Sequence, residues 1–353
     1  MSAANAFVVR AGRRAAALIA SRGLQPGDIA CIPGAAGGPK GLGLLAFDRL
    51  LHREWLPPAQ ALQLVGASIG AWRMAALAQP DAATAIDRLQ HAYIYGQRYS
   101  SPPSPSEVAA KCRAIVAALI GDAVFSVRHG VALQIVTARA RGVVERSASR
   151  GAFVRAVLAN ALSRHRLGDY FERVIFHAGA APFLEQPFDR CGLQHVAITA
   201  ANVTDALLAS GTIPLVSRAV RDIAGAPRGS YWDGALVDYH LLIPYAPTGG
   251  RVVLYPHFND YVTPGWLDKH LPWRRAPRGH RWLDDVLLIA PSPAFLATLP
   301  DRKLPDRRDF YRYASDHDAR ERVWTRAVAE CERFAEQALE WLLRPDPSRL
   351  QPL

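Results

Sequence analysis

Short apolar runs rich in β-branched residues alternate with stretches of helical pattern along most of this 353-residue chain. This alternation is typical of a mostly parallel sheet covered by helices on both faces, because parallel strands need long crossover connections. We therefore predict an α/β fold. The predicted strands are residues 28–33, 61–66, 131–138, 173–177, 195–201 and 251–255. The predicted helices are residues 11–22, 42–54, 69–79, 82–97, 106–120, 151–164, 203–210 and 317–343.

The last third of the chain has a different pattern. Residues 256–312 are irregular and rich in Pro, Trp and Arg, whereas residues 316–343 are amphipathic and predict a terminal helix. Residues 100–106 are rich in Ser and Pro, but the sheet pattern resumes after them, so we expect a loop there and not a domain linker.

The composition indicates a folded protein, with 50% hydrophobic and 21% charged residues. Four widely spaced cysteines form no C-x-x-C pair, which argues against a disulfide framework or zinc knuckle and suits a reducing, cytoplasmic compartment. No apolar run is long enough to span a membrane. Basic residues at 10–14 before a short apolar run superficially resemble a secretory signal, but we expect an opening helix there.

The formal net charge of +11 comes mainly from arginine, since only four of the 42 basic residues are lysines. An anionic partner would explain this charge, with a phospholipid surface or nucleic acid as the two candidates. An arginine-biased proteome explains it equally well. No zinc-finger pattern, RNP motif or lysine-rich arm is present, so we do not expect nucleic-acid binding.

A glycine-rich turn with one lysine, CIPGAAGGPKGLG at 31–43, follows the first predicted strand. A phosphate-binding P-loop would be G-x-x-x-x-G-K-[ST]. Gly34 and Lys40 fit that pattern, but Pro39 stands where the second glycine belongs and Gly41 where the hydroxyl residue belongs. Since Pro39 also removes a backbone N–H, the turn is a poor nucleotide site.

The sequence Gly66-Ala67-Ser68-Ile69-Gly70 has the form G-x-S-x-G and stands between a predicted strand and a predicted helix. This strand–turn–helix context is what a nucleophile elbow requires. The serine would then lie at the N-terminus of a helix, where the helix dipole favours a developing negative charge. We therefore predict that Ser68 is a nucleophile.

A nucleophilic serine needs a base, and two readings remain open. Among eleven histidines, His257 is the best placed for a Ser-His-Asp triad, although a satisfied structural histidine explains it too. The other candidate is Asp233 in Asp233-Gly234-Ala235, which alone would also fit an ordinary β-turn. A lone aspartate base has an ordinary pKa of about 3.9, so it must be partly desolvated to accept the proton.

Four blocks taken in order resemble the patatin-like phospholipase family, which has G-G-G-x-[KR]-G, G-x-S-x-G, A-S-x-x-x-P and D-G-[GA]. The blocks here are AGGPKG at 36–41, GASIG at 66–70, ASGTIP at 209–214 and DGA at 233–235. The resemblance covers roughly residues 28–255. This chain departs from the pattern at Ala36, where the first glycine is usual, and at Lys40, where arginine is more usual and would give a bidentate fork.

The resemblance implies a three-layer α/β/α sandwich with a mostly parallel central sheet. It also implies a Ser–Asp dyad acting on lipid acyl esters, with neither cofactor nor metal. In this sequence the implied nucleophile is Ser68 and the implied base Asp233. The implied oxyanion hole consists of Gly37, Gly38 and Ala36, and the supporting residues are Lys40, Gly66, Gly70 and Gly234. The expected substrate is a phospholipid, a lysophospholipid or another acyl ester.

The same interpretation divides the chain into an N-terminal helical segment at 1–27, a catalytic domain at 28–255, and a segment at 256–353 that packs on the same domain. Two other functions stay open: a Ser-His-Asp α/β-hydrolase esterase, and a non-catalytic lipid-surface binding protein. Tryptophans and arginines mix at 261–282. They fit a lid or a peripheral docking segment for anionic membranes, and they equally fit a solvated surface loop.

Overall fold

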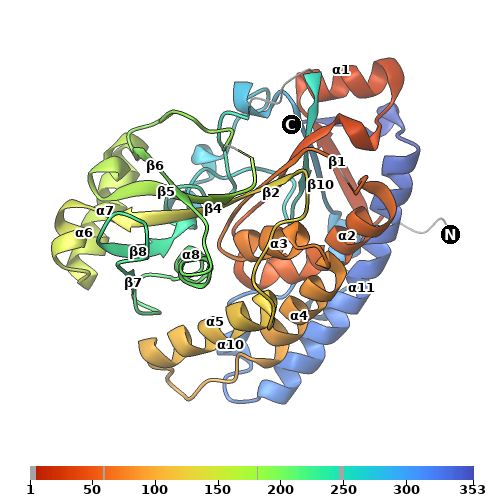
Figure 1. Cartoon of the computed structure of the whole chain (residues 1–353). Helices are drawn as coiled ribbons and strands as arrows, with labels where there is room; N and C mark the ends of the chain where they lie inside the picture. Colours follow the sequence, from red (N-terminus) through yellow and green to blue (C-terminus); the bar gives the residue numbers. More distant parts are fainter. Residues whose placement is uncertain (1–4, 59, 181, 246–249) are drawn as a thin grey trace.

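The computed structural model describes residues 5–58, 60–180, 182–245 and 250–353, and it has an α/β fold in which helices flank one mostly parallel sheet (Figure 1). The strand order is β11-β1-β10-β9-β2-β3-β4-β5-β6. These strands are β1 (Phe7–Ala11), β2 (Ile29–Gly34), β3 (Leu62–Ala67), β4 (Val131–Ala140), β5 (Phe171–Ala178), β6 (Leu193–Ala197), β9 (Val252–Pro256), β10 (Val286–Pro291) and β11 (Gln351–Pro352).

The centre of the sheet is parallel. Strands β10, β9, β2, β3 and β4 pair with parallel neighbours, whereas β1 on β10 and β5 on β4 are antiparallel. All residues of β2 and β10 are buried, as expected for strands that are covered on both faces. The predicted sheet, with a mostly parallel centre between helical layers, is thus confirmed.

The six predicted strands correspond to β2, β3, β4, β5, β6 and β9, with ends that differ by up to four residues. The predicted helices correspond to α1 (Arg13–Arg22), α2 (Leu45–Leu50), α3 (Ile69–Ala78), α4 (Ala82–Tyr95), α5 (Pro105–Ile120), α7 (Arg150–Leu162), α8 (Val203–Ser210) and α11 (His317–Leu343). The predicted helix at 42–54 is shorter, because a 3₁₀ segment precedes α2 and a single π-helical turn follows it.

Two parts of the predicted organisation are wrong. The segment at 1–27 is not simply helical, because β1 lies in it and pairs with β10. The segment at 256–312 is not irregular throughout, because it contains β10 next to β9. Both terminal segments therefore belong to the same sheet as the rest. The structure adds α6 (Gly142–Arg146), α9 (Pro293–Leu296) and α10 (Asp309–Arg312), together with the short strands β7 (Val220–Arg221) and β8 (Ser230–Asp233).

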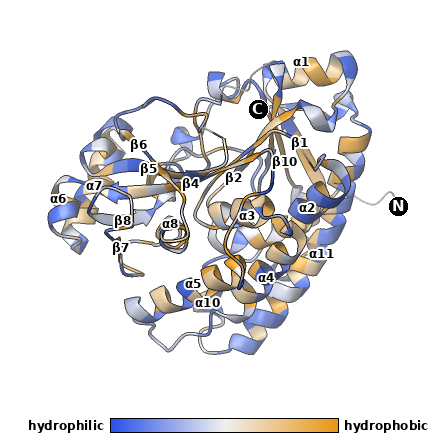
Figure 2. Cartoon of the chain, viewed as in Figure 1, coloured by the Kyte–Doolittle hydropathy of each residue, from blue (hydrophilic) through white to orange (hydrophobic). Residues whose placement is uncertain are grey.

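One face of the sheet is covered by more helices than the other. In the view of Figure 1, α2, α3, α4, α5, α10 and α11 lie below the sheet, and α1 lies above it together with the turns at 266–283. Helix α11 packs its apolar side on α2, which confirms the predicted terminal helix, and the Asp316 carboxylate caps its start. Figure 2 shows hydrophobic residues along the central strands and α3, and both polar and hydrophobic residues along α11. Within the described ranges, no helix combines the length and apolarity needed to cross a membrane.

Candidate active site

Ser68 lies in the sharp turn between the end of β3 and the start of α3. Its backbone has φ 57° and ψ −132°, which is a left-handed conformation that costs a non-glycine residue about 1–3 kcal/mol. Such a turn lifts the side chain above the edge of the sheet at the helix N-terminus. The predicted strand, turn and helix are confirmed here.

The glycines on either side of Ser68 allow the turn to pack closely. A Cβ atom on Gly70 would lie 1.9 Å from the carbonyl oxygen of Gly34, and one on Gly66 would lie 2.5 Å from the amide nitrogen of Ala71. Neither position has room for a side chain. Gly70 is therefore required by the close approach of the elbow to β2, and Gly66 by the close approach of the turn to the start of α3.

Strand pairing explains how Asp233 reaches Ser68. Strand β3 pairs with β4 as far as Ala67 opposite Val136, and β8 pairs with the next residues of β4, beginning with Asp233 opposite Thr137. Since β5 occupies the other edge of β4 along these residues, β8 continues the edge that β3 leaves free. The last residue of β8 is consequently placed beside the residue that follows β3.

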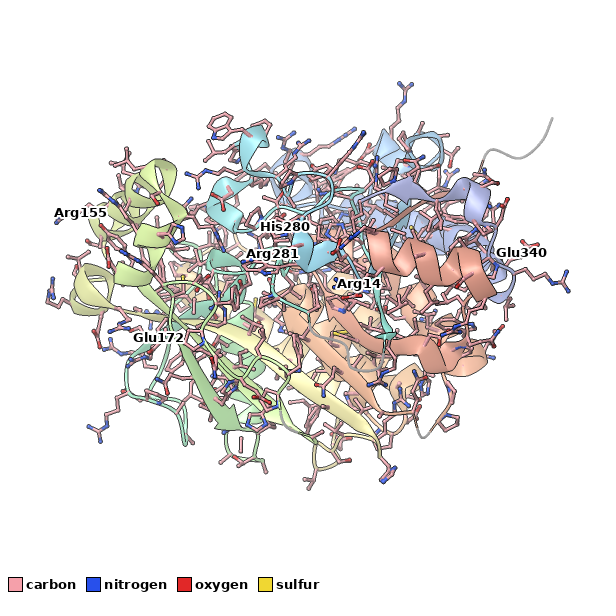
Figure 3. All side chains as sticks on the ribbon, turned by 90° about the horizontal axis from the view of Figure 1, so that it is seen from above. Arg14, Arg155, Glu172, His280, Arg281 and Glu340 are labelled. Atoms are coloured by element: carbon pink, nitrogen blue, oxygen red, sulfur yellow. The ribbon has the colours of Figure 1, made fainter. Side chains whose placement is uncertain are left out.

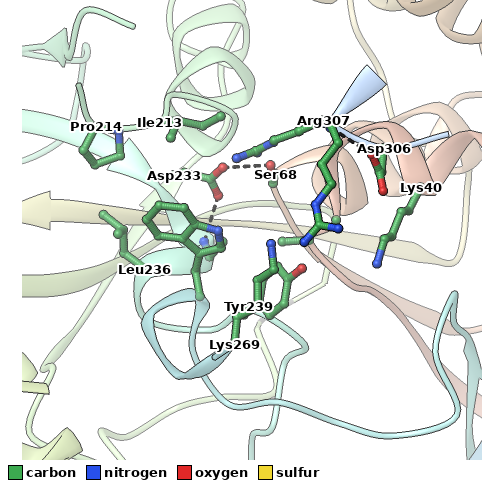
Figure 4. A pocket seen from close by; sticks show the side chains of 15 residues that line it. Lys40, Ser68, Ile213, Pro214, Asp233, Leu236, Tyr239, Lys269, Asp306 and Arg307 are labelled. Carbon is green, nitrogen blue, oxygen red and sulfur yellow. Dashed lines mark hydrogen bonds between the residues drawn. The ribbon is translucent and has the colours of Figure 1, made fainter. Parts of the chain in front are cut away.

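The two side chains form a direct hydrogen bond. The Ser68 hydroxyl donates to Asp233 Oδ2 at 2.8 Å, and the Ala235 amide donates to Asp233 Oδ1 at 2.8 Å (Figure 4). Gly234 passes close to β4, since a Cβ atom there would lie 2.2 Å from the carbonyl oxygen of Val136. The hydrogen bonds hold the carboxylate so that one oxygen faces the serine.

Burial raises the pKa of Asp233 to about 6, against the opposing effects of the Arg307 charge and of the hydrogen bonds from Ala235 and Ser68. The aspartate is 4% exposed. Its carboxylate is therefore partly desolvated, as a carboxyl base at near-neutral pH requires, because burial disfavours the charged form.

Ser210 fixes the elbow from the other side. Its hydroxyl accepts a hydrogen bond from the Ser68 amide at 2.9 Å and donates one to the carbonyl oxygen of Val136 at 2.8 Å. It is the serine of the ASGTIP block, for which the sequence indicated no role. The contact ties the C-terminus of α8 to Ser68 and to β4.

The glycine-rich turn follows β2 and leads into a 3₁₀ segment, Gly38–Leu44. In the described part of the chain, no acceptor lies within hydrogen-bond distance of the Gly37 or Gly38 amides. A Cβ atom on Gly37 would lie 2.4 Å from the Phe258 ring, and Gly38 has φ +58°. Both amides are thus free to bind an oxyanion, position 37 has no room for a side chain, and the conformation at position 38 favours glycine.

The expected third donor differs from the prediction. The Ala36 amide donates to the carbonyl oxygen of Tyr239 at 2.9 Å, so it is not free to bind an oxyanion. The Ala36 side chain is buried at the end of the turn. Ala36 therefore anchors the loop to the segment that follows Asp233 and is not an oxyanion donor in this structure.

Two cavities meet at Ser68. The first has a volume of about 260 Å³ and carries Lys40, Lys269, Arg307 and Arg308, which Figure 4 shows in part. The second has a volume of about 540 Å³ and a mostly apolar lining that includes Trp72, Tyr93, Val108, Ile213, Val216 and Phe310. Ser68, Ile213 and Arg307 line both cavities. Ser68 thus borders a basic compartment and an apolar one.

The basic compartment is not neutralised by the protein. Among the described residues, none of its four cations forms an ion pair, and Asp306 beside them is paired with Lys303 at 3.1 Å. Burial and the neighbouring Lys269 lower the pKa of Lys40, whose ammonium lies 5.3 Å from the Phe258 ring centroid. An uncompensated cluster of this kind favours an anionic ligand.

His257 lines neither of the two cavities at Ser68. It is fully buried outside both cavities, where its ring packs on His240 with centroids 4.4 Å apart. The Asn259 amide donates to its Nδ1 at 2.8 Å, and burial lowers the pKa of His257 to about 3. No histidine in the described part of the chain is hydrogen-bonded to Ser68, so the triad reading gains no support.

Several residues of this site were not predicted. Arg307 and Arg308 lie in a loop without pattern between α9 and α10, and the apolar lining is drawn from α3, α4, α5 and α10. Only the positive charge of the whole chain hinted at such cations. For the described ranges, no group of three or more His, Cys, Asp or Glu side chains has the spacing of a metal site.

Comparison with known proteins does not assign this site. No family model matches the chain, and no curated protein matches it either.

Proposed function

We propose that this chain is a serine acyl hydrolase of the patatin-like type, which cleaves acyl esters through Ser68 and Asp233. The observation that carries the proposal is the 2.8 Å hydrogen bond between the Ser68 hydroxyl and a buried aspartate whose pKa is raised to about 6. The four motifs in patatin-like order support the same conclusion. The hydrogen bond and the four motifs are the support for the proposal, since no family model matches the chain.

The reaction follows from this pair of side chains. Ser68 Oγ attacks the ester carbonyl carbon while its proton passes to Asp233, and the carbonyl oxygen becomes an oxyanion facing the Gly37 and Gly38 amides. The C–O bond to the alcohol then breaks, and the alcohol leaves with the proton from Asp233. Water attacks the acyl-serine with Asp233 again as base, which releases the fatty acid and restores the serine.

The two cavities indicate the substrate class. An acyl chain in the apolar cavity would be stabilised by about 0.8 kcal/mol for each buried methylene. The basic cavity would receive an anionic group on the alcohol side of the ester. We therefore expect long-chain acyl esters with a phosphate group, such as phospholipids or lysophospholipids, to be better substrates than short neutral esters.

The test compares wild type, Ser68→Ala and Ser147→Ala on phospholipids, lysophospholipids, neutral monoacylglycerols and short p-nitrophenyl esters. Ser147 is an exposed serine that lines neither cavity, and it serves as the matched control. We expect Ser68→Ala to lose at least about 10³-fold in kcat and all labelling by a fluorophosphonate probe, with the control unchanged. Hydrolysis that survives in Ser68→Ala at the wild-type rate would refute the proposal.

The substrate class has its own measurement. Lys269→Gln removes one exposed charge from the basic cavity without touching the catalytic pair. We expect KM for a lysophospholipid to rise several-fold and KM for a monoacylglycerol of equal chain length to stay constant. Equal changes for both substrates would show that the basic cavity does not bind the anionic group.

A further inference from the structure

Helix α7 exposes apolar side chains to solvent along one side. Their exposed fractions are 49% for Val154, 43% for Val157, 59% for Leu158 and 74% for Leu162. Spacings of three and four residues place them on the same side of a helix. The opposite side packs Phe153 against Trp232, with ring centroids 5.3 Å apart. A surface helix is ordinarily polar on its outer side, so this one presents an unusual face.

An exposed tryptophan extends this face. Trp273 is 75% exposed and lies in a short 3₁₀ turn, Pro272–Arg274. The turn is fastened to the end of α7, because the Arg274 guanidinium donates to the carbonyl oxygens of Asn160 at 3.3 Å and Ala161 at 3.2 Å. We call Val154, Val157, Leu158, Leu162 and Trp273 the α7 surface.

Basic residues surround the α7 surface. Residues 146–168 contain five arginines, residues 269–283 contain four arginines and one lysine, and neither stretch contains Asp or Glu. Exposed members include Arg150, Arg155, Arg166, Arg275 and Arg278. In Figure 3, Arg155 lies at the outer edge of the molecule on the side of α7, whereas Arg281 lies nearer the middle of the view. Two copies joined through this surface would bring these cations together, whereas an anionic layer complements them.

Segments next to the α7 surface form part of the wall of the basic cavity. Trp266 and Lys269, which line that cavity, precede Trp273 in the same segment. Arg164, just beyond α7, donates to Asp268 at 3.0 Å and also to the carbonyl oxygen of Val237. A partner bound at the α7 surface would therefore be linked through only a few residues to the mouth of the candidate active site.

We propose that the α7 surface docks on anionic lipid bilayers, with Trp273 and the leucines of α7 at the level of the headgroups and the arginines on the lipid phosphates. Tryptophan favours the interface, and each basic residue near an anionic surface strengthens binding about fivefold. Docking does not require a catalytic Ser68. Its use in presenting lipid to the cavity rests on the proposed function.

The experiment measures co-sedimentation with phosphatidylcholine vesicles that contain or lack phosphatidylserine. The full-length Ser68→Ala protein is used as background, so that the vesicles are not hydrolysed. The variants are Leu158→Asp/Leu162→Asp, Trp273→Ala and Arg150→Gln/Arg155→Gln. The matched control is Val124→Asp, because Val124 is 80% exposed and lies outside the surface. Circular dichroism and urea unfolding check that each variant is folded.

We expect tighter binding to the anionic vesicles, loss of at least tenfold in partitioning for the leucine pair and for Trp273→Ala, and about 25-fold for the arginine pair. Val124→Asp should bind like its parent. Equal binding to both vesicle types, binding unchanged in the folded variants, or no binding would overturn the proposal. So would a dimer in sedimentation velocity that Leu158→Asp/Leu162→Asp dissociates, because the surface would then be a self-interface.

The two proposals fail separately. Turnover of a soluble short-chain ester by the α7 variants in the wild-type Ser68 background should be unchanged, since these residues do not line either cavity. Docking with no ester hydrolysis by the wild type would leave the α7 surface standing and refute the catalytic proposal. Hydrolysis without docking would do the reverse.

Discussion

Replacing Asp233 by asparagine should produce an inactive protein that is more stable than the wild type at neutral pH. Asparagine has nearly the same shape as aspartate, and its oxygen can still accept from the Ala235 amide, which lies 2.8 Å from Asp233 Oδ1. Its amide group can donate to the Ser68 hydroxyl in place of the present bond. The substitution removes the base and its charge but leaves no cavity, so its effect on stability is mainly electrostatic.

The magnitude follows from the pKa of the carboxyl. Burial raises the pKa of Asp233 from 3.8 to about 6. A group whose folded pKa lies above its unfolded pKa contributes stability that is complete below the unfolded pKa and is lost as pH rises through the folded pKa. At pH 7 the buried carboxylate therefore costs about 3 kcal/mol relative to a neutral side chain. At pH 4 the same relation leaves less than about 1 kcal/mol.

The assay is urea unfolding at both pH values, followed by tryptophan fluorescence. We expect Asp233→Asn to gain about 3 kcal/mol at pH 7, little at pH 4, and to lose ester hydrolysis at both. Asp122→Asn is the matched control, because Asp122 is exposed and forms no ion pair in the described part of the chain. A variant less stable than wild type at pH 7, or a gain of equal size at pH 4, would refute the burial argument.

Four further outcomes follow from the site. The rate on a soluble neutral ester should rise with pH through about 6, because Asp233 must be ionised to accept a proton. In quenched assays, Arg307→Gln should move the pH midpoint of the rate upward, because the Arg307 charge lowers the pKa of Asp233. The control Arg308→Gln should leave the midpoint unchanged. A downward movement in Arg307→Gln would contradict the prediction. Ser210→Ala should leave the Ser68 amide without its acceptor. The free energy of urea unfolding should then fall by about 1–3 kcal/mol, and kcat should fall as well. No change in either quantity would show that the contact is dispensable. Gly70→Ala places a Cβ atom 1.9 Å from a carbonyl oxygen of β2, so unfolding should show a loss of at least about 2 kcal/mol, and wild-type stability would disprove the close approach.

The long, strongly patterned elements could be predicted from the sequence. Helix α11 has a clear apolar side over 27 residues, and β4 is a ten-residue strand of mostly apolar residues. Strand β10 was missed although all six of its residues are buried. It is as long as β2 and β3, but the Pro-, Trp- and Arg-rich residues before it dominated the local pattern. Strand β8 has only four residues, and its pairing with β4 is not encoded in any local period.

The candidate site shows the same division. Ser68 could be predicted, because the elbow is a local strand–turn–helix with its own glycines. Asp233 needed the resemblance to a family, since its role depends on where β8 lies. Arg307 carried no local signal at all, because it acts by its position at the junction of two cavities. The engagement of the Ala36 amide by Tyr239 is likewise a contact between distant segments.

The placement of β8 on β4 has a consequence for how the proposed hydrolysis depends on temperature. The hydroxyl and the carboxyl belong to residues 165 positions apart, and the carboxyl is held there by a strand of four residues, Ser230–Asp233. If these residues detached from β4, the two groups would separate while every longer strand stayed paired. Such a small local opening needs far less free energy than global unfolding. Hydrolysis should then fade on heating before the bulk of the sheet melts, which makes turnover an early reporter of fraying at this edge.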